Sequence, residues 1–251
     1  MTMYEIVAGV RTWYEVRGEG EPLVLLHGGF SDSRDFEPNL ARLADRFRVY
    51  LVDRRGHGRT PDVPGPVSPD VLAGDVVAFL EHVVGGPAHL VGYSAGGVVA
   101  LGVAQRRPDL VRRLAVLNSA FGKDGWLFLP QPGGGLPAEV ADRYAEVSPD
   151  GRDHLPVVVE KFARAAHDPE VVDLAAITAP TLVLGSDDDI VRLEHTVALY
   201  RGIADAQLCV LPGTSHLMPF ERPDLCASLV ADFLTTTPRP LMPIRRAEVV
   251  A

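Results

Sequence analysis

The sequence predicts an α/β protein in which helices cover both faces of a mostly parallel β-sheet. The first observation is a series of short, uninterrupted apolar runs, which are typical of strands buried on both faces. The second is that helix-length segments with start and stop signals separate these runs. The third is size, because 251 residues that are 47% hydrophobic suit one domain with a sizeable core.

The chain begins with alternating apolar and polar residues and then changes to continuous apolar runs. Residues 4–7 and 11–16, separated by a turn at Gly9, predict an antiparallel hairpin. Buried strands are expected at residues 23–26, 49–52, 90–91, 114–117, 181–184 and 207–211. Because right-handed crossovers join such strands, their carboxyl ends meet at one edge of the sheet, where functional loops gather.

Helical segments are expected between these strands, at residues 35–47, 71–84, 95–106 and 192–200. The second of them has the clearest boundaries. Ser68 can cap the first turn, Pro69 suits a first helical position, and Gly85 follows the last turn. These signals indicate where the helix begins and ends.

The regular alternation stops between residues 118 and 181. This interval contains a Pro- and Gly-rich stretch at residues 130–135, followed by amphipathic segments near 139–147 and 155–166. A connection of this length is uncommon unless it is a functional lid or a disordered loop. The helical patterns favour a lid.

One serine lies at the junction of a predicted strand and a predicted helix, in the segment G-Y-S-A-G at residues 92–96. A serine that merely caps an ordinary helix is the alternative. Such a cap does not call for glycine on both sides, whereas a sharp turn that exposes a nucleophile does, because glycines let strand and helix approach closely. The pattern therefore predicts that Ser94 is a nucleophile.

A serine hydroxyl needs a neighbouring base, and the base needs a group that orients it. His216 lies in a turn-rich segment directly after a predicted strand, and Asp187, Asp188 and Asp189 follow another strand. All of them are at carboxyl ends of strands. The order along the chain is Ser, Asp, His.

With this order, the chain resembles the α/β-hydrolase family. Four further segments match motifs of that family: H-G-G at residues 27–29, D-R-R-G-H-G at 53–58, G-S-D-D at 185–188 and G-T-S-H at 213–216. The resemblance covers nearly the whole chain and implies an eight-stranded sheet with a small helical cap. Residues 1–120 and 176–236 would form the core, residues 121–175 the cap, and residues 237–251, which lack an apolar pattern, a C-terminal tail.

The resemblance also implies a role for each matched residue. Ser94 would be the nucleophile and His216 the base that accepts its proton. Asp188 would orient the imidazole, since the family's acid is third after the glycine of its motif. By spacing alone, Asp187 and Asp189 remain open as the acid.

An oxyanion hole and a substrate pocket follow from the same resemblance. The backbone N–H groups of Ala95 and Gly29 would bind the oxyanion, although a shifted loop would give that role to Phe30. Phe30 itself and three other large apolar residues are expected to bind substrate: Trp126, Phe128 and Met218. For Trp126 and Phe128, packing of the cap onto the core is the equal alternative.

Other polar residues are expected to serve the scaffold. We expect His27 and His57 to make structural hydrogen bonds and His195 to be a solvated helix residue. Asp53 and Arg55 belong to a turn that is structural in the resembling family. No histidine has metal-ligand spacing and no glycine-rich loop suits phosphate, so neither a metal nor a cofactor is expected.

Composition narrows the partners further. The formal net charge is -9, which argues against nucleic acid and suits a small neutral or apolar substrate. No apolar stretch reaches the roughly 20 residues that span a bilayer, and the first residues do not form a secretory signal, so a cytoplasmic protein without a membrane partner is expected. The oligomeric state, monomer or homodimer, stays open.

The leading hypothesis for the reaction is hydrolysis of a small to medium apolar ester or lactone. Serine at position 94 argues against dehalogenase or epoxide-hydrolase chemistry, which uses an aspartate there. A C–C bond hydrolase or enol-lactonase of an aromatic or secondary-metabolite pathway would carry the same three residues. A hydrolase-like receptor with slow turnover is a second alternative.

Overall fold

The computed structural model describes residues 2–168, 171–242 and 244. Its centre is an eight-stranded sheet in the order β1-β2-β4-β3-β5-β6-β7-β8. The strands are β1 (Thr2–Val7), β2 (Val10–Arg17), β3 (Pro22–Leu26), β4 (Arg48–Val52), β5 (Ala88–Tyr93), β6 (Val111–Leu117), β7 (Thr181–Asp188) and β8 (Ala206–Ser215). The predicted fold class is confirmed.

The first two strands form the predicted antiparallel hairpin, and β2 also pairs antiparallel with β4. All other neighbouring strands are parallel. The carboxyl ends of β3 to β8 therefore point the same way, and the loops that leave them meet at one edge of the sheet. The apolar run of β5 is buried as expected, since every residue of this strand is buried.

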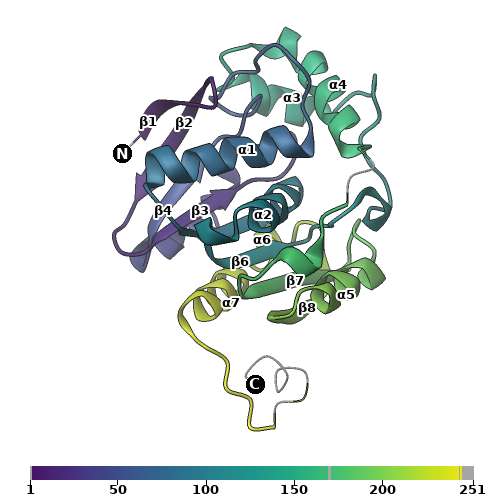
Figure 1. Cartoon of the computed structure of the whole chain (residues 1–251). Coiled ribbons are helices and arrows are strands. Elements are labelled where there is room, and N and C mark those ends of the chain that lie inside the picture. The colour runs from purple at the N-terminus through teal and green to yellow at the C-terminus, as the bar shows by residue number, and fades with distance from the viewer. Residues whose placement is uncertain (1, 169–170, 243, 245–251) are drawn as a thin grey trace.

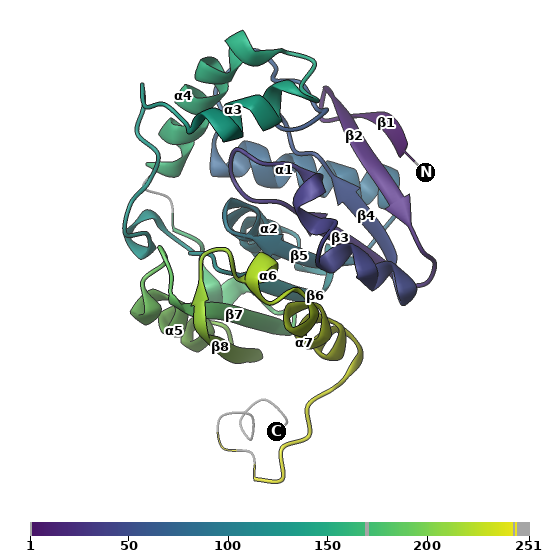
Figure 2. The ribbon, with the colours of Figure 1, turned by 180° about the vertical axis from the view of Figure 1, so that it is seen from behind.

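Helices cover both faces of the sheet (Figures 1 and 2). On one face, α1 (Pro69–Phe79), α2 (Ala95–Arg106) and α5 (Leu193–Gly202) enclose the larger apolar core. On the other face, the short 3₁₀ helices η1 (Ser33–Phe36) and η2 (Leu40–Asp45) and the last helix, α7 (Pro223–Thr235), enclose the smaller one.

The predicted boundaries of α1 are confirmed. The Ser68 hydroxyl accepts a hydrogen bond from the Val71 N–H at 3.2 Å, and Pro69 is in the first turn. After α1 a single π-helical turn, η3 (Leu80–Val84), leads to Gly85, whose φ of 84° suits glycine.

The single helix expected at residues 35–47 is wrong, because this segment forms η1 and η2 instead. Pro38 lies between them and has no N–H for a helical hydrogen bond. Asn39 leaves the helical conformation, and its side chain accepts the N–H of Leu40 to start η2.

Between β6 and β7 the chain forms the β6–β7 insertion, residues 118–180. It contains the two predicted helices, as α3 (Ala138–Ala145) and α4 (Leu155–Ala166), and three 3₁₀ turns, η5 (Lys123–Gly125), η6 (Arg152–His154) and η7 (Leu174–Ala176). Both helices lie together at the top of Figure 1. Val158 and Phe162 of α4 are buried in the larger core, so the amphipathic pattern corresponds to real burial.

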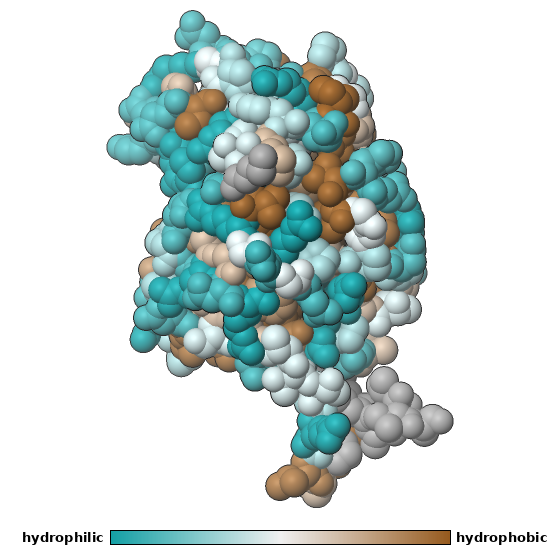
Figure 3. Space-filling view, turned by 90° about the vertical axis from the view of Figure 1, so that its left-hand side faces the viewer, coloured by the Kyte–Doolittle hydropathy of each residue, from teal (hydrophilic) through white to brown (hydrophobic). Residues whose placement is uncertain are grey.

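Within the described residues, no helix has both the length and the apolar composition to cross a bilayer. The face in Figure 3 is largely hydrophilic, with hydrophobic residues in separate groups. The expected tail has neither helix nor strand over residues 237–242, while 243 and 245–251 lie outside the described residues.

Candidate active site

Ser94 lies on a sharp turn between β5 and α2. Its backbone has φ 53° and ψ -124°, a conformation that costs a non-glycine residue about 1–3 kcal/mol. A Cβ on Gly96 would lie 2.1 Å from the carbonyl oxygen of Leu26, and one on Gly92 would lie 2.4 Å from that of Gly96. These values confirm the strained turn. Ser94 directly precedes α2, but its side chain makes no capping hydrogen bond, so the alternative of an ordinary helix cap is wrong.

His216 follows β8 and faces this serine. Its Nε2 is 2.9 Å from the Ser94 Oγ. The His216 carbonyl oxygen accepts hydrogen bonds from the Tyr93 hydroxyl at 2.8 Å and the Asn118 side chain at 3.1 Å. Sequence reasoning missed these two supports, although Tyr93 ends β5 and Asn118 directly follows the neighbouring strand β6.

The carboxylate beside His216 belongs to Asp189, which corrects the expectation of Asp188. The Asp189 Oδ1 is 2.6 Å from the His216 Nδ1, and only 2% of its side chain is exposed. Asp188 is exposed, and Asp187 instead accepts the N–H groups of Gly213 and Thr214 near the end of β8. The register between β7 and β8 shifts near Asp188, so the first residue beyond β7 turns toward the imidazole.

These contacts suit one tautomer of the His216 imidazole. With Asp189 accepting at Nδ1, that nitrogen carries the proton and Nε2 is free to accept from the Ser94 hydroxyl. A serine, an imidazole and a buried carboxylate in this sequence of hydrogen bonds can transfer the serine proton during nucleophilic attack.

Two backbone N–H groups lie beside Ser94. A Cβ built on Gly29 would be 3.6 Å from the Ala95 Cβ, so the loop after β3 and the start of α2 are in contact. Within the described chain, neither the Gly29 nor the Ala95 N–H has a protein acceptor. The Phe30 N–H donates to His57 Nε2 at 3.0 Å and is therefore not available to an oxyanion.

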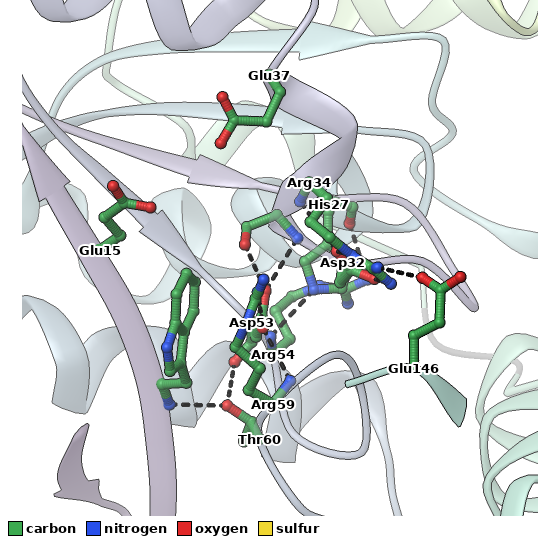
Figure 4. Close-up of polar contacts among 12 residues, drawn as sticks. Glu15, His27, Asp32, Arg34, Glu37, Asp53, Arg54, Arg59, Thr60 and Glu146 are labelled. Carbon is green, nitrogen blue, oxygen red and sulfur yellow. Dashed lines mark hydrogen bonds and ion pairs between the residues drawn. The ribbon is translucent and has the colours of Figure 1, made fainter. Parts of the chain in front are cut away.

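His27 and His57 hold the loops below the serine, and their predicted scaffold role is confirmed. His27 Nε2 accepts the Arg54 N–H at 3.0 Å, and its Nδ1 donates to the Gly28 carbonyl at 2.8 Å. Figure 4 shows His27 and Arg54 in contact, although they come from loops after different strands. Burial lowers the pKa of His57 to about 3 and that of His27 well below its usual range.

Asp53 and Arg55 also have structural roles. The buried Asp53 carboxylate accepts the N–H and hydroxyl of Ser33 at 2.9 and 2.6 Å and the N–H of Arg59 at 2.8 Å. Arg55 forms a two-bond ion pair with Asp75. Neither side chain reaches Ser94, so the turn orders the loops rather than the reaction.

The buried histidines predict a loss of stability in acid. Between about pH 6.5 and 3 the unfolded chain protonates position 57 while the folded protein does not, so stability falls as the pH falls, by up to about 1.4 kcal/mol per pH unit. We expect His57→Gln to lessen this dependence by that amount in urea unfolding at several pH values.

The exposed His82 provides a matched control. His82→Gln should keep the wild-type dependence of unfolding free energy on pH. If His57→Gln also kept it, burial would not hold His57 neutral in the folded state.

A cavity of about 450 Å³ opens on Ser94 and His216. Most of its lining is apolar, with contributions from α2, α4 and the start of the β6–β7 insertion. Phe30, Trp126 and Phe128 line it as expected. Met218 does not, because α6 (Met218–Glu221) turns this side chain into the smaller core, where it is fully buried.

The start of the β6–β7 insertion is attached to the loop that follows Asp189. Trp126 forms a β-bridge with Val191, and its ring lies 6.1 Å from that of His216. His195 is not the solvated residue that was expected, because its ring stacks on Phe121 and its Nε2 accepts the Phe121 N–H at 3.1 Å. Burial lowers the pKa of His195.

Within residues 2–168, 171–242 and 244, no group of three or more His, Cys, Asp or Glu side chains is arranged to hold a metal ion.

A strained serine turn at the carboxyl edge of a mostly parallel sheet, facing a histidine and a carboxylate, is the site of an α/β hydrolase. A sequence profile described as "Alpha/beta hydrolase family" matches residues 23–229, and the chain belongs to this family.

Individual relatives share this fold at low identity. A protein named "Putative carbamate hydrolase RutD" from Agrobacterium fabrum is 28% identical over 88% of this chain and 97% of its own. A 2-hydroxy-6-oxo-6-(2'-aminophenyl)hexa-2,4-dienoic acid hydrolase from Metapseudomonas resinovorans is 26% identical over 90% and 88%. The crystal structure of a serine hydrolase involved in carbazole degradation has a TM-score of 0.78 at 25% identity, over 94% of this chain and 98% of that one.

Proposed function

We propose that this protein is a serine hydrolase that cleaves a small to medium apolar carboxylic ester or lactone through an acyl-enzyme on Ser94. The observation that carries the proposal is the chain of hydrogen bonds from Ser94 through His216 to Asp189, which opens on an apolar cavity. Hydrolase relatives over most of the chain support the general class.

The reaction begins when the Ser94 Oγ attacks the substrate carbonyl carbon and His216 Nε2 takes its proton. The carbonyl oxygen becomes an oxyanion, which the N–H groups of Gly29 and Ala95 bind. Collapse of this intermediate expels the alkoxide, which the imidazolium protonates. His216 then takes a proton from water, whose oxygen attacks the acyl carbon. Collapse of the second intermediate releases the acid and returns the proton to the Ser94 Oγ. Asp189 orients the imidazole and stabilises its charged form.

We propose that residues 121–175 form a cap that closes the cavity and selects the substrate. Trp126, Phe128 and Phe162 of this region line the cavity together with Phe30 of the core. Large apolar side chains on several sides favour an apolar acyl or alcohol group over a peptide or a polysaccharide. The region is attached to the core through the Trp126–Val191 bridge.

C–C bond hydrolysis is the second candidate, supported by the similarity to the dienoic acid hydrolase of Metapseudomonas resinovorans. It would use the same serine and histidine but a substrate with a cleavable bond beside a ketone. A C–C hydrolase should turn over simple esters slowly, whereas an esterase should turn them over rapidly.

The first experiment combines fluorophosphonate labelling with an ester assay. We expect mass spectrometry to locate the label on Ser94, and we expect continuous turnover of short-chain p-nitrophenyl esters. Labelling of Ser94 without turnover would favour the C–C hydrolase or a slow receptor. No labelling of Ser94, while a standard serine esterase is labelled in parallel, would contradict the proposal.

A further inference from the structure

Arg54 is a buried cation that has no carboxylate partner within the described part of the chain. The residue is 5% exposed, it forms no ion pair, and its Nε has no hydrogen-bond acceptor. The adjacent Arg55, by contrast, is neutralised by Asp75. A buried charge without a counter-charge is costly and is kept where another interaction compensates it.

Burial lowers the pKa of Arg54 to about 10, so the guanidinium keeps its charge at neutral pH. The side chain also borders the cavity that contains Ser94. A permanent positive charge therefore lies within the wall of an apolar active site, where electrostatic interactions are weakly screened.

The contacts of Arg54 show what its charge acts on. One terminal nitrogen donates to the carbonyl oxygens of His27 and Gly28, at 2.8 and 2.9 Å. The Gly28 carbonyl also accepts the His27 Nδ1–H, so two donors hold it. Because the Gly28 C=O and the Gly29 N–H belong to one planar peptide unit, fixing the carbonyl fixes the direction of the N–H.

We propose that Arg54 is a positioning residue that aims and polarises the Gly28–Gly29 peptide, so that the Gly29 N–H binds the oxyanion of the reaction. This inference depends on the proposed function, since it adds a residue that supports the oxyanion hole of that reaction. A donor to the carbonyl makes the N–H of that peptide a stronger donor in turn. The negative charge that arises in the transition state then faces the unpaired positive charge.

The same geometry argues against substrate binding by Arg54 itself. Nη2 is directed at the loop after β3 and Nε is sealed from solvent, which, within the described residues, leaves only Nη1 without a hydrogen bond and outside the set of buried unpartnered atoms. A direct contact of Nη1 with substrate would change KM, and the test below separates that case. An effect on the transition state rather than on substrate binding changes kcat more than KM.

The test compares Arg54→Gln and Arg54→Lys with the wild type. With a neutral p-nitrophenyl ester we expect Arg54→Gln to lower kcat by about 10- to 100-fold, because losing an oxyanion donor outright costs about 10²- to 10³-fold, and to change KM by less than about threefold. The affinity for a trifluoromethyl ketone, whose serine adduct carries an oxyanion, should fall by the same factor as kcat/KM. Arg54→Lys keeps a charged donor and should recover part of both losses.

Arg55→Gln is the matched control, since it removes a neighbouring arginine that faces Asp75 instead of the loop. It should lower the thermal midpoint while leaving the ratio of trifluoromethyl ketone affinity to substrate KM at the wild-type value. If Arg54→Gln does not fold, Arg54→Lys carries the same comparison.

Two results would overturn the inference. One is an Arg54→Gln protein with wild-type kcat and trifluoromethyl ketone affinity or, where Arg54→Gln does not fold, an Arg54→Lys protein in which both stay at the wild-type values. The other is a rise in KM confined to a carboxylate-bearing ester, which would assign Arg54 to substrate binding. Fluorophosphonate labelling of the wild-type protein separates the role of Arg54 from the proposed function. If Ser94 of the wild type is not labelled, the proposed function itself is contradicted.

Discussion

Replacing Ser94 with alanine is expected to lower kcat for an ester substrate by at least ~10³-fold, since removing one member of the triad removes most nucleophilic activation. The fold should persist, because the Ser94 side chain makes no capping bond that α2 needs. The measurement is steady-state hydrolysis of the best p-nitrophenyl ester, together with a thermal unfolding curve.

Ser228→Ala is a suitable control for this variant. Ser228 is an exposed serine of α7 whose hydroxyl donates to the Asp224 carbonyl at 2.8 Å, and it is not part of the lining of the active-site cavity. It should retain wild-type turnover. A Ser94→Ala protein with more than a tenth of wild-type turnover would show that another residue is the nucleophile.

Asp189→Asn is expected to lower kcat by about 10²- to 10⁴-fold, because an amide can donate to Nδ1 and so favour the wrong imidazole tautomer. The reason for choosing this residue is the 2.6 Å contact between its Oδ1 and the His216 Nδ1. Asp188→Asn is the matched control at the neighbouring, exposed position and should stay within about threefold of the wild type.

Asp187→Asn should have an intermediate effect. Its carboxylate accepts the N–H groups of Gly213 and Thr214, which lowers the pKa of Asp187 and supports the end of β8, directly before His216. An amide oxygen can still accept one of these bonds. If Asp188→Asn proved the most damaging of the three, the assignment of Asp189 would be wrong.

The features that could be predicted from the sequence are those that depend on neighbouring residues. The turn at Ser94 follows from glycines on both sides of it, since a Cβ on either would meet backbone atoms. The start of α1 follows from Ser68 and Pro69. By contrast, the helix expected at residues 35–47 was wrong, because Pro38 has no N–H for a helical hydrogen bond and separates η1 from η2.

The errors at the site have a different cause. Met218 is apolar and follows His216 closely, but α6 directs it into the core between the sheet and α7. That Met218 lies two residues after His216 does not indicate where its side chain points. The supports from Tyr93 and Asn118 could not be predicted for the same reason, since they depend on how β5, β6 and β8 align.

The sequence by itself determined the α/β class, the strained turn of Ser94 and the order of the serine, acid and histidine motifs, because local patterns of glycine, proline and apolar residues specify them. The tertiary structure decided which of three adjacent carboxylates faces His216. That choice depends on the register shift between β7 and β8, where a change of one residue turns a side chain from solvent to the imidazole. It likewise decided that Arg54 contacts the loop of Gly28, since the two residues come from separate strands that only the sheet brings together.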